Sequence, residues 1–244
     1  MTDRRPGGSR EGEAGAMLPA WPGALVVIAH PDDESFGLGA VIDRLAAAGA
    51  AVHVLCYTHG GASTLNQTHA DLHRARGTEL RRAAAELGAA GVTLLDYPDG
   101  GLAGIPAAEL AGHAADAAVR AAGSGRLVLD DTGVTGHPDH RAATGAAVLA
   151  GRRAGLPVLA WTLPAAVAAR LSAGTGQDFV GQPSDRIDLR VRVSRERQRR
   201  AALLHASQIS PGAVLWRRLG LLGDREYLRW LLPPAAAIPS ASAR

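Results

Sequence analysis

The feature that most constrains the fold is an alternation of short apolar runs with longer helical segments. Residues 24–29 form the first uninterrupted apolar run, as expected for a strand that is buried on both faces of a sheet. Further strand-like runs follow at 51–57, 92–95, 127–129 and 158–161. Helical spacing between and after them predicts helices at 36–48, 70–87, 106–122 and 139–154. This order predicts an α/β fold with a doubly wound, mostly parallel sheet and helices on both faces.

The last third of the chain is less regular. Residues 162–193 are expected to cover one rim of the sheet, and 194–207 and 224–232 to form closing helices. One dense basic cluster lies here, and we interpret it as a strand edge followed by a solvated helix face: Arg190, Arg192, Arg195, Arg197, Arg199 and Arg200. Aromatic residues make up only 4% of the chain, which leaves little to stack on bases. Nucleic acid is therefore not an expected partner.

The domain boundaries follow from the two ends of the chain. The 244 residues are enough for one domain with its own core. We expect a disordered leader over 1–20, a single domain over 21–232 and a flexible tail over 233–244. Pro19 and Pro22 interrupt any signal-peptide core, and no apolar run reaches the ~18 residues of a membrane helix. These observations predict a cytoplasmic protein without a membrane span.

The chain contains no lysine and a single cysteine. All 26 basic residues are arginine, so a Schiff-base lysine and a P-loop lysine are excluded. Cys56 is the single cysteine, which excludes an internal disulfide and a cysteine-based zinc or iron–sulfur site. The net charge of +3 is small for this length and does not indicate an acidic partner.

Polar clusters follow four of the predicted strands. They are 30–34 (HPDDE), 58–61 (THGG), 96–100 (DYPDG), and 130–131 followed by 137–140 (HPDH). Ligands of doubly wound sheets sit beyond the carboxyl ends of the strands, so these clusters are expected to share one rim. An aspartate in the first cluster could instead cap the next helix, but that role does not need His30.

Imidazole and carboxylate groups from two strand ends make up the ligand set of a mononuclear zinc site with an open position. Without cysteine only N/O ligation remains, so iron(II) and manganese stay open as alternatives to Zn²⁺. Leftover carboxylate and imidazole groups beside such an ion can accept and donate protons. The pattern therefore favours metal-assisted hydrolysis, with no serine or cysteine nucleophile.

Residues 29–34 (AHPDDE) and 136–140 (GHPDH) resemble the two signatures of the PIG-L/LmbE-like N-acetylglucosaminyl deacetylases. Segments 76–80, 87–88, 97–102 and 205–208 are similar to further family elements in the same order. The resemblance spans about residues 24–208. It implies a Rossmann-like, zinc-dependent enzyme that removes an N-acyl group, usually acetyl, from an amino sugar.

The resemblance also implies roles for individual residues. Asp32 would be the general base, and His137 would stabilise the oxyanion and serve as the acid. Asp139 would orient His137 through an imidazole N–H. The implied metal ligands are His30, Asp33 and His140.

Other positions keep two interpretations each. Arg76 and Asp99 match family positions that contact sugar hydroxyls. Alternatively, Arg76 forms a surface salt bridge and Asp99 is a turn residue. His205 and Gln208 either line the pocket or brace the C-terminal helix. His59 replaces an arginine or asparagine of the family turn, and we expect a loop histidine there rather than a substrate contact.

Three functions are weighed. The first is removal of an N-acetyl group from an amino-sugar moiety of a glycoside, pseudosaccharide or natural-product intermediate. The second is cleavage of a larger amide, as in mycothiol-S-conjugate amidases, and the third is sugar binding without catalysis. The expected partner is a small-molecule amino-sugar conjugate, and a homo-oligomer is compatible with the sequence. The alanine- and arginine-rich, lysine-free composition indicates a high-GC genome, which is compatible with a role in secondary metabolism.

Overall fold

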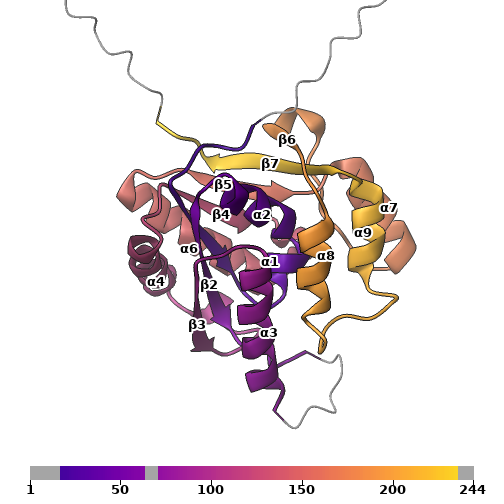
Figure 1. The fold of residues 1–244 in the computed structure, drawn as a ribbon, viewed down its shortest axis with the longest axis horizontal. Coiled ribbons are helices and arrows are strands. Elements are labelled where there is room, and N and C mark those ends of the chain that lie inside the picture. The colour runs from indigo at the N-terminus through magenta and orange to yellow at the C-terminus, as the bar shows by residue number, and fades with distance from the viewer. Residues whose placement is uncertain (1–16, 64–70, 236–244) are drawn as a thin grey trace, which may run out of the picture.

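The computed structural model describes residues 17–63 and 71–235. Its described part contains one seven-stranded sheet in the order β3-β2-β1-β4-β5-β7-β6 (Figure 1). The strands are β1 (Gly23–Ile28), β2 (Ala51–Thr58), β3 (Gly91–Tyr97), β4 (Gly125–Leu129), β5 (Val158–Thr162), β6 (Leu189–Arg192) and β7 (Arg225–Leu232). Strands β1 to β5 are parallel, whereas β7 pairs antiparallel with both β5 and β6. The predicted α/β, mostly parallel architecture is confirmed.

Helices cover both faces of the sheet. They are α1 (Asp33–Phe36), α2 (Gly39–Ala47), α3 (Leu72–Glu86), α4 (Ala107–Arg120), α5 (Gly133–Gly136), α6 (Pro138–Ala154), α7 (Ala165–Thr175), α8 (Glu196–Leu203) and α9 (Val214–Leu222), with short 3-10 turns at Leu102–Gly104 and Ser184–Arg186. Helices α4 and α6 pack on one face, and α2, α3, α7, α8 and α9 share the core of the other face. Figure 1 shows α4 well apart from α8 and α9. Residues 1–16 of the expected leader and 236–244 of the expected tail lie outside the described residues.

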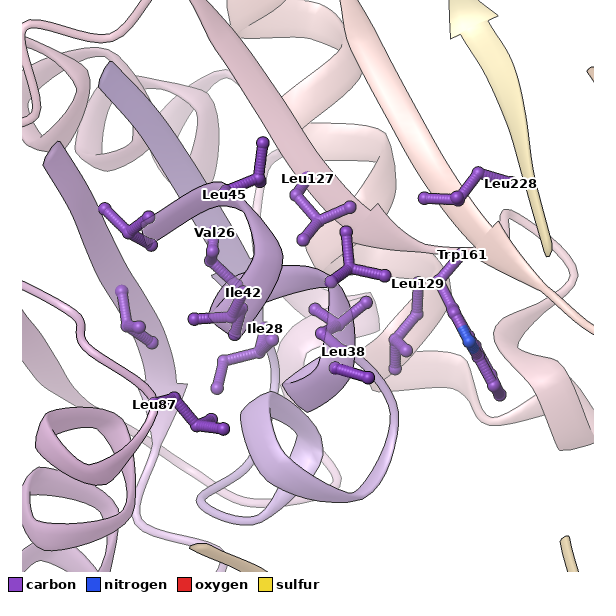
Figure 2. Close-up of a cluster of buried hydrophobic side chains, with 14 of the residues drawn as sticks. Val26, Ile28, Leu38, Ile42, Leu45, Leu87, Leu127, Leu129, Trp161 and Leu228 are labelled. Atoms are coloured by element: carbon purple, nitrogen blue, oxygen red, sulfur yellow. The ribbon is translucent and has the colours of Figure 1, made fainter. Parts of the chain in front are cut away.

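The burial of strand β1 on both faces of the sheet explains why its sequence is uniformly apolar. Leu25 and Val27 point into the core under α4 and α6, while Val26 and Ile28 point into the opposite core. All four side chains are buried. Figure 2 shows Val26 and Ile28 beside Ile42 of α2, in a cluster that extends to Trp161. A strand with apolar neighbours on both faces loses the polar alternation of a half-exposed strand.

The structure corrects the predicted helix over 36–48. The chain there forms two helices, α1 and α2, which are separated at Gly37 and Leu38. A Cβ on Gly37 would lie 2.8 Å from the Leu129 side chain, so glycine permits the close approach of this turn to β4. The break lets α1 turn the acidic residues after β1 toward the end of the sheet.

The prediction of a helix over 224–232 is wrong, because this segment is strand β7. Its first half alternates, with Glu226 and Leu228 buried and Arg225 and Tyr227 only partly so. That period of two is typical of a strand. Within 162–193 the structure adds helix α7 and edge strand β6, and α8 follows β6, as the arginine cluster predicted.

Asp130 joins β4 to β7 and makes the stability of the fold depend on pH. Arg229 Nε lies 2.7 Å from the buried Asp130 carboxylate, which also accepts the Thr132 N–H at 3.0 Å. Burial alone would raise the pKa of Asp130, but these hydrogen bonds lower it to about 2. A depressed carboxyl pKa contributes stability above about pH 4 that is lost as the pH falls toward 2.

Asp130→Asn is therefore expected to lower the free energy of unfolding by about 2 kcal/mol at pH 7, and by progressively less between pH 4 and pH 2. Urea unfolding of both proteins at several pH values measures the difference. A constant difference across this pH range would show that the Asp130 charge does not carry the effect. The exposed carboxylate of Asp116 offers a matched control, Asp116→Asn, for which we expect a change below about 0.5 kcal/mol.

Among the described residues, no helix combines the length and the apolarity that crossing a membrane requires.

Candidate metal centre and active site

The candidate site lies where the strand order reverses, at the carboxyl ends of β1 and β4. These strands are neighbours in the sheet, but the chain visits β2 and β3 between them. The turn after β1 carries residues 30–34, and the connection after β4 carries 130–140. Such a switch point is where doubly wound sheets bind ligands. A pocket of about 600 Å³ opens there, and it includes the side chains of His30, Asp32, Asp33, Arg76, Asp99, His137, His140 and Gln208.

Three of the predicted ligands converge. His30 Nδ1 lies 3.2 Å from His140 Nε2, and His140 Nε2 lies 3.1 Å from Asp33 Oδ1. The other oxygen of Asp33 accepts the backbone N–H groups of His30 and Ala29 at 3.0 and 3.2 Å. Asp33 Oδ1 is thus the oxygen that faces His140, whereas His30 Nδ1 lies 3.8 Å from Oδ2. The structure brings together His30, Asp33 and His140 as the sequence predicted.

Hydrogen bonds on the far side of each ring determine which nitrogen offers an electron pair. His140 Nδ1 lies 3.2 Å from the Gly133 carbonyl, which can only accept, so Nδ1 carries the proton. His30 Nε2 lies 3.0 Å from Asp99 and 3.3 Å from Asp139, which assigns its proton to Nε2. His30 Nδ1 and His140 Nε2 therefore present lone pairs toward the same point.

The donor set fits a divalent ion. Lone pairs and a carboxylate oxygen that face one another repel unless a proton or a cation lies between them. Ligands about 2.0–2.1 Å from a tetrahedral zinc lie about 3.3 Å apart, close to the observed 3.1 and 3.2 Å. The pocket also favours positive charge: burial lowers the pKa of His30, yet the hydrogen bond to Asp99 and the charge of Asp33 raise it to about 9.

Asp32 lies next to these ligands in a strained backbone conformation. Its φ of 117° is rare for a residue with a side chain, and asparagine and aspartate tolerate positive φ best. Arg76 Nη2 lies 2.9 Å from the Asp32 carboxylate. Burial and the charge of Asp33 raise the pKa of Asp32 to about 6, although Arg76 opposes this. A carboxylate of this basicity can accept a proton near neutral pH.

A buried ion pair supports the turn from behind. Glu34 accepts the backbone N–H of Asp32 at 3.0 Å with one carboxylate oxygen, and His205 Nε2 lies 2.6 Å from the other. Both side chains are fully buried. Burial lowers the pKa of His205, but the charge and hydrogen bond of Glu34 raise it overall. His205 therefore braces the turn after β1 and is not among the residues that line the pocket, whereas the sequence had offered a pocket residue or a brace of the C-terminal helix.

Removing one charge of this pair should destabilise the fold. We expect Glu34→Gln to lower the free energy of unfolding by about 3–5 kcal/mol, because His205 would keep a buried charge without a carboxylate. Chemical denaturation of chelated protein measures this change. Glu86→Gln is the matched control, since its pair with Arg200 is half exposed and screened by solvent, and we expect a much smaller loss. Equal losses in the two variants would contradict a charged Glu34–His205 pair.

His137 begins helix α6 and is held by a backbone group. Its Nδ1 accepts the N–H of Asp139 at 3.2 Å, so the proton of the neutral ring is on Nε2. Burial and the neighbouring rings of His140 and His30 lower the pKa of His137, which favours this neutral form. A neutral imidazole with Nε2–H can donate a hydrogen bond into the pocket.

The carboxylate of Asp139 has a different partner from the one expected. It accepts the backbone N–H groups of Gly100 and Leu102 at 2.7 and 3.1 Å and lies 3.3 Å from His30 Nε2. The sequence-based expectation that an imidazole N–H of His137 bonds this carboxylate is therefore corrected. The His137 Nδ1 that this expectation needed as a donor instead accepts the backbone N–H of Asp139. Asp139 orients the proposed ligand His30.

Arg76 and Asp99 both reach the pocket, but much of their hydrogen bonding is internal. The buried Arg76 guanidinium donates to the carbonyls of Pro31 and Gly60 as well as to Asp32. Asp99 bonds His30 with Oδ1 and accepts the Ala62 N–H at 2.8 Å with Oδ2. These contacts hold three loops in register around the site. A role in sugar binding stays a prediction for both.

Gln208 lines the pocket, whereas His59 is not among the lining residues. Gln208 Oε1 accepts the Ser63 hydroxyl at 2.8 Å. His59 stacks on His73, and its Nε2 lies 2.9 Å from the exposed Asp96. Sequence reasoning missed Thr135 and Gln177 as lining residues. Thr135 stands only two positions before His137, but no sequence pattern marks Gln177.

Comparison with known proteins agrees with this geometry. The family model of the GlcNAc-PI de-N-acetylases, PIG-L, matches residues 25–150. The chain belongs to the PIG-L family. Residues that this match covers include both histidine motifs of the candidate site. The family is one of metal-dependent hydrolases, so the assignment places the protein among enzymes.

A curated relative from Thermobifida fusca (strain YX), 1D-myo-inositol 2-acetamido-2-deoxy-alpha-D-glucopyranoside deacetylase, is 33% identical over 141 residues. The match covers 48% of this chain and about half, 49%, of that protein. Two solved structures resemble the PIG-L chain more widely. The antimicrobial reagent A40926 pseudoaglycone deacetylase Dbv21 is 20% identical, with a TM-score of 0.65 over 89% of this chain and 99% of that one.

The second is GalB, a 4-carboxy-2-hydroxymuconate hydratase from Pseudomonas putida KT2440. It is 22% identical, with a TM-score of 0.63 over 88% of this chain and 98% of that one. At this identity both structures show the shared fold alone. Because a deacetylase and a hydratase share it, the reaction has to be argued from the site.

Proposed function

We propose that this PIG-L protein is a zinc-dependent hydrolase that removes an N-acetyl group from an amino-sugar moiety. The observation that carries the proposal is the convergence of His30 Nδ1, Asp33 Oδ1 and His140 Nε2, with the carboxylate of Asp32 beside them and outside this ligand set. Two imidazoles and one carboxylate suit zinc, and three protein ligands leave a position for water. Asp32, His137 and Asp139 complete the proposed machinery.

A divalent ion held by His30, Asp33 and His140 would lower the pKa of a water ligand and polarise an amide carbonyl. Asp32 accepts the proton of the attacking water at its carboxylate, whose raised pKa matches that task. Arg76 holds this carboxylate in place. His137 donates a hydrogen bond from Nε2–H to the developing oxyanion, and the proton that Asp32 has accepted passes to the leaving amine. Asp139 and Asp99 keep the proton of His30 on Nε2.

Names of related proteins support the substrate class. The family description refers to N-acetylglucosaminyl lipids, and the curated relative acts on an acetamido-deoxy-glucopyranoside. The pocket itself is open and rich in carboxylate, amide and hydroxyl groups, which suits sugar hydroxyls. Both names refer to the N-acetyl group of an amino-sugar moiety, and this agreement supports that substrate class over the larger amides of thiol-conjugate amidases.

A panel of N-acetylated amino sugars and their glycosides, assayed for free amine and acetate, tests the proposal. We expect turnover that is abolished by a chelator and restored by Zn²⁺. A thiol-conjugate amide in the same panel tests the alternative cleavage. Hydrolysis that persists in chelated, metal-free protein would contradict the metal-dependent mechanism. Cleavage of the thiol-conjugate amide alone would contradict the proposed amino-sugar substrate and favour the alternative function.

A further inference from the structure

A second hollow opens from the metal centre on the side of helix α9. This recess has a volume of about 180 Å³ and shares Asp32, Asp33 and His140 with the larger pocket. Its remaining walls are mostly apolar, from Phe36, Leu129, Val134, Trp161, Phe179 and Leu215. In Figure 2, Leu129 and Trp161 lie at the same end of the labelled core cluster as Leu228 of β7. An apolar recess beside a hydrolytic centre is suited to a part of the substrate that carries methylene groups.

One charged side chain lies in this apolar wall. Arg218 of α9 lines the recess and is only 9% exposed. Its guanidinium carbon lies 5.0 Å from the centre of the Trp161 ring. Within the described residues, the buried Nε and Nη2 atoms of Arg218 have no hydrogen-bond partner. A buried donor of this kind is normally paired, so Arg218 keeps unused hydrogen-bonding capacity beside the recess.

Nearby charges do not neutralise Arg218. Two acids act on Arg218, Glu226 and Asp33. Glu226 accepts the Trp161 indole N–H at 2.7 Å with Oε2 and pairs with Arg195 through Oε1. Arg195 and Arg218 thus share the Glu226 carboxylate, and Asp33 is a proposed metal ligand. Burial lowers the pKa of Arg218 to about 10, so the side chain is still protonated at neutral pH. An uncompensated buried cation is costly unless an anion joins it.

The position of the recess indicates which part of the substrate enters it. The reacting amide carbon has to lie near Asp32, Asp33 and His140, which border both hollows. The polar pocket on one side suits the sugar, so the acyl chain is the part directed into the apolar recess. Its volume holds about six water-sized groups, and a succinyl chain adds about five non-hydrogen atoms beyond the amide carbon.

We propose that the recess is an acyl subsite for a short acyl chain that ends in a carboxylate, and that Arg218 binds this carboxylate through its N–H groups. The inference rests on the proposed hydrolase function. Water adds to the amide carbonyl, the C–N bond breaks, and the products are the free amino sugar and a dicarboxylate. A guanidinium and a carboxylate form a charge-assisted, bidentate pair when both are shielded from water.

The test compares N-succinylglucosamine with N-pentanoylglucosamine, which has a neutral chain of similar length. We expect wild-type kcat/KM to favour the succinyl substrate at least tenfold, and Arg218→Gln to remove this preference. Arg217→Gln is the matched control, because Arg217 on the same helix is bonded to the exposed Gly174 carbonyl. Equal kcat/KM values in the wild type, or a preference that survives in Arg218→Gln, would overturn the subsite.

Binding of free succinate and butyrate to the metal-loaded protein gives a readout without turnover. Calorimetry should show tighter binding of succinate than of butyrate in the wild type and in Arg217→Gln, but not in Arg218→Gln. If no amide is hydrolysed and this pattern holds, the hydrolase proposal fails and the anion site stands. If N-acetylglucosamine is hydrolysed without any succinate preference, the subsite alone fails. If Arg218→Gln does not fold, Arg218→Lys, which keeps the charge, takes its place in these measurements.

Discussion

Asp32→Asn is expected to lower kcat for amide hydrolysis by about 10²–10⁴-fold while leaving the bound metal in place. The carboxylate is the proposed proton acceptor, and the amide of asparagine cannot take that proton. Asp32 is separate from the three converging donors, since its contacts are with Arg76 and, through its backbone N–H, with Glu34. Steady-state kinetics and elemental analysis of the same preparation measure both quantities.

Asp32→Asn is more informative than Asp32→Ala, because the backbone at Asp32 has a φ of 117°. Asparagine tolerates this conformation, whereas alanine would add strain to the loss of the carboxylate. Asp116→Asn on the exposed face of α4 is the control and should leave kcat unchanged. Unaltered turnover in Asp32→Asn would exclude this carboxylate as the base. Loss of metal in Asp32→Asn would assign Asp32 to the ion instead.

The fold could be predicted from the sequence wherever the local pattern of apolar residues shows which side chains are buried. The apolar run of β1 and the helical spacing of α6 are local signals, and both elements appear within one or two residues of the prediction. β7 was missed because only half of Arg225–Leu232 alternates and its partners β5 and β6 are distant in sequence. Antiparallel addition at a sheet edge depends on those partners rather than on a local period.

In the candidate site, too, the positions of residues on the turns could be predicted from the sequence, whereas contacts between distant segments could not. His30 and Asp33 lie on one turn and His140 on another, and topology alone places both turns at one rim. The partners of Asp139 could not be read in this way, since its contact with His30 depends on the direction of the first turn of α6. Arg218 looks like any helix arginine in the sequence. Only its burial against Trp161 distinguishes it.

His140→Ala is expected to weaken metal binding by at least about 100-fold, since removing a direct ligand should exceed the 10–100-fold cost of losing an outer-shell partner. Asp33 stays anchored by the N–H groups of Ala29 and His30, so the variant tests the imidazole rather than the turn. Competition with a chromogenic chelator measures affinity, and cobalt(II) absorption reports the loss of tetrahedral coordination. Zn²⁺ should raise the melting temperature of the wild type but not of His140→Ala.

His137→Ala separates ion binding from oxyanion stabilisation at the same helix terminus. His137 lies next to both rings, yet its Nδ1 is occupied by the Asp139 N–H, so we place it outside the ligand set. The variant should keep the metal and lose kcat more than it changes KM, because the missing hydrogen bond acts on the transition state. Wild-type metal affinity in His140→Ala, or metal loss in His137→Ala, would exchange the roles of the two histidines. The first result would also leave His30 and Asp33 with too few partners for a zinc site.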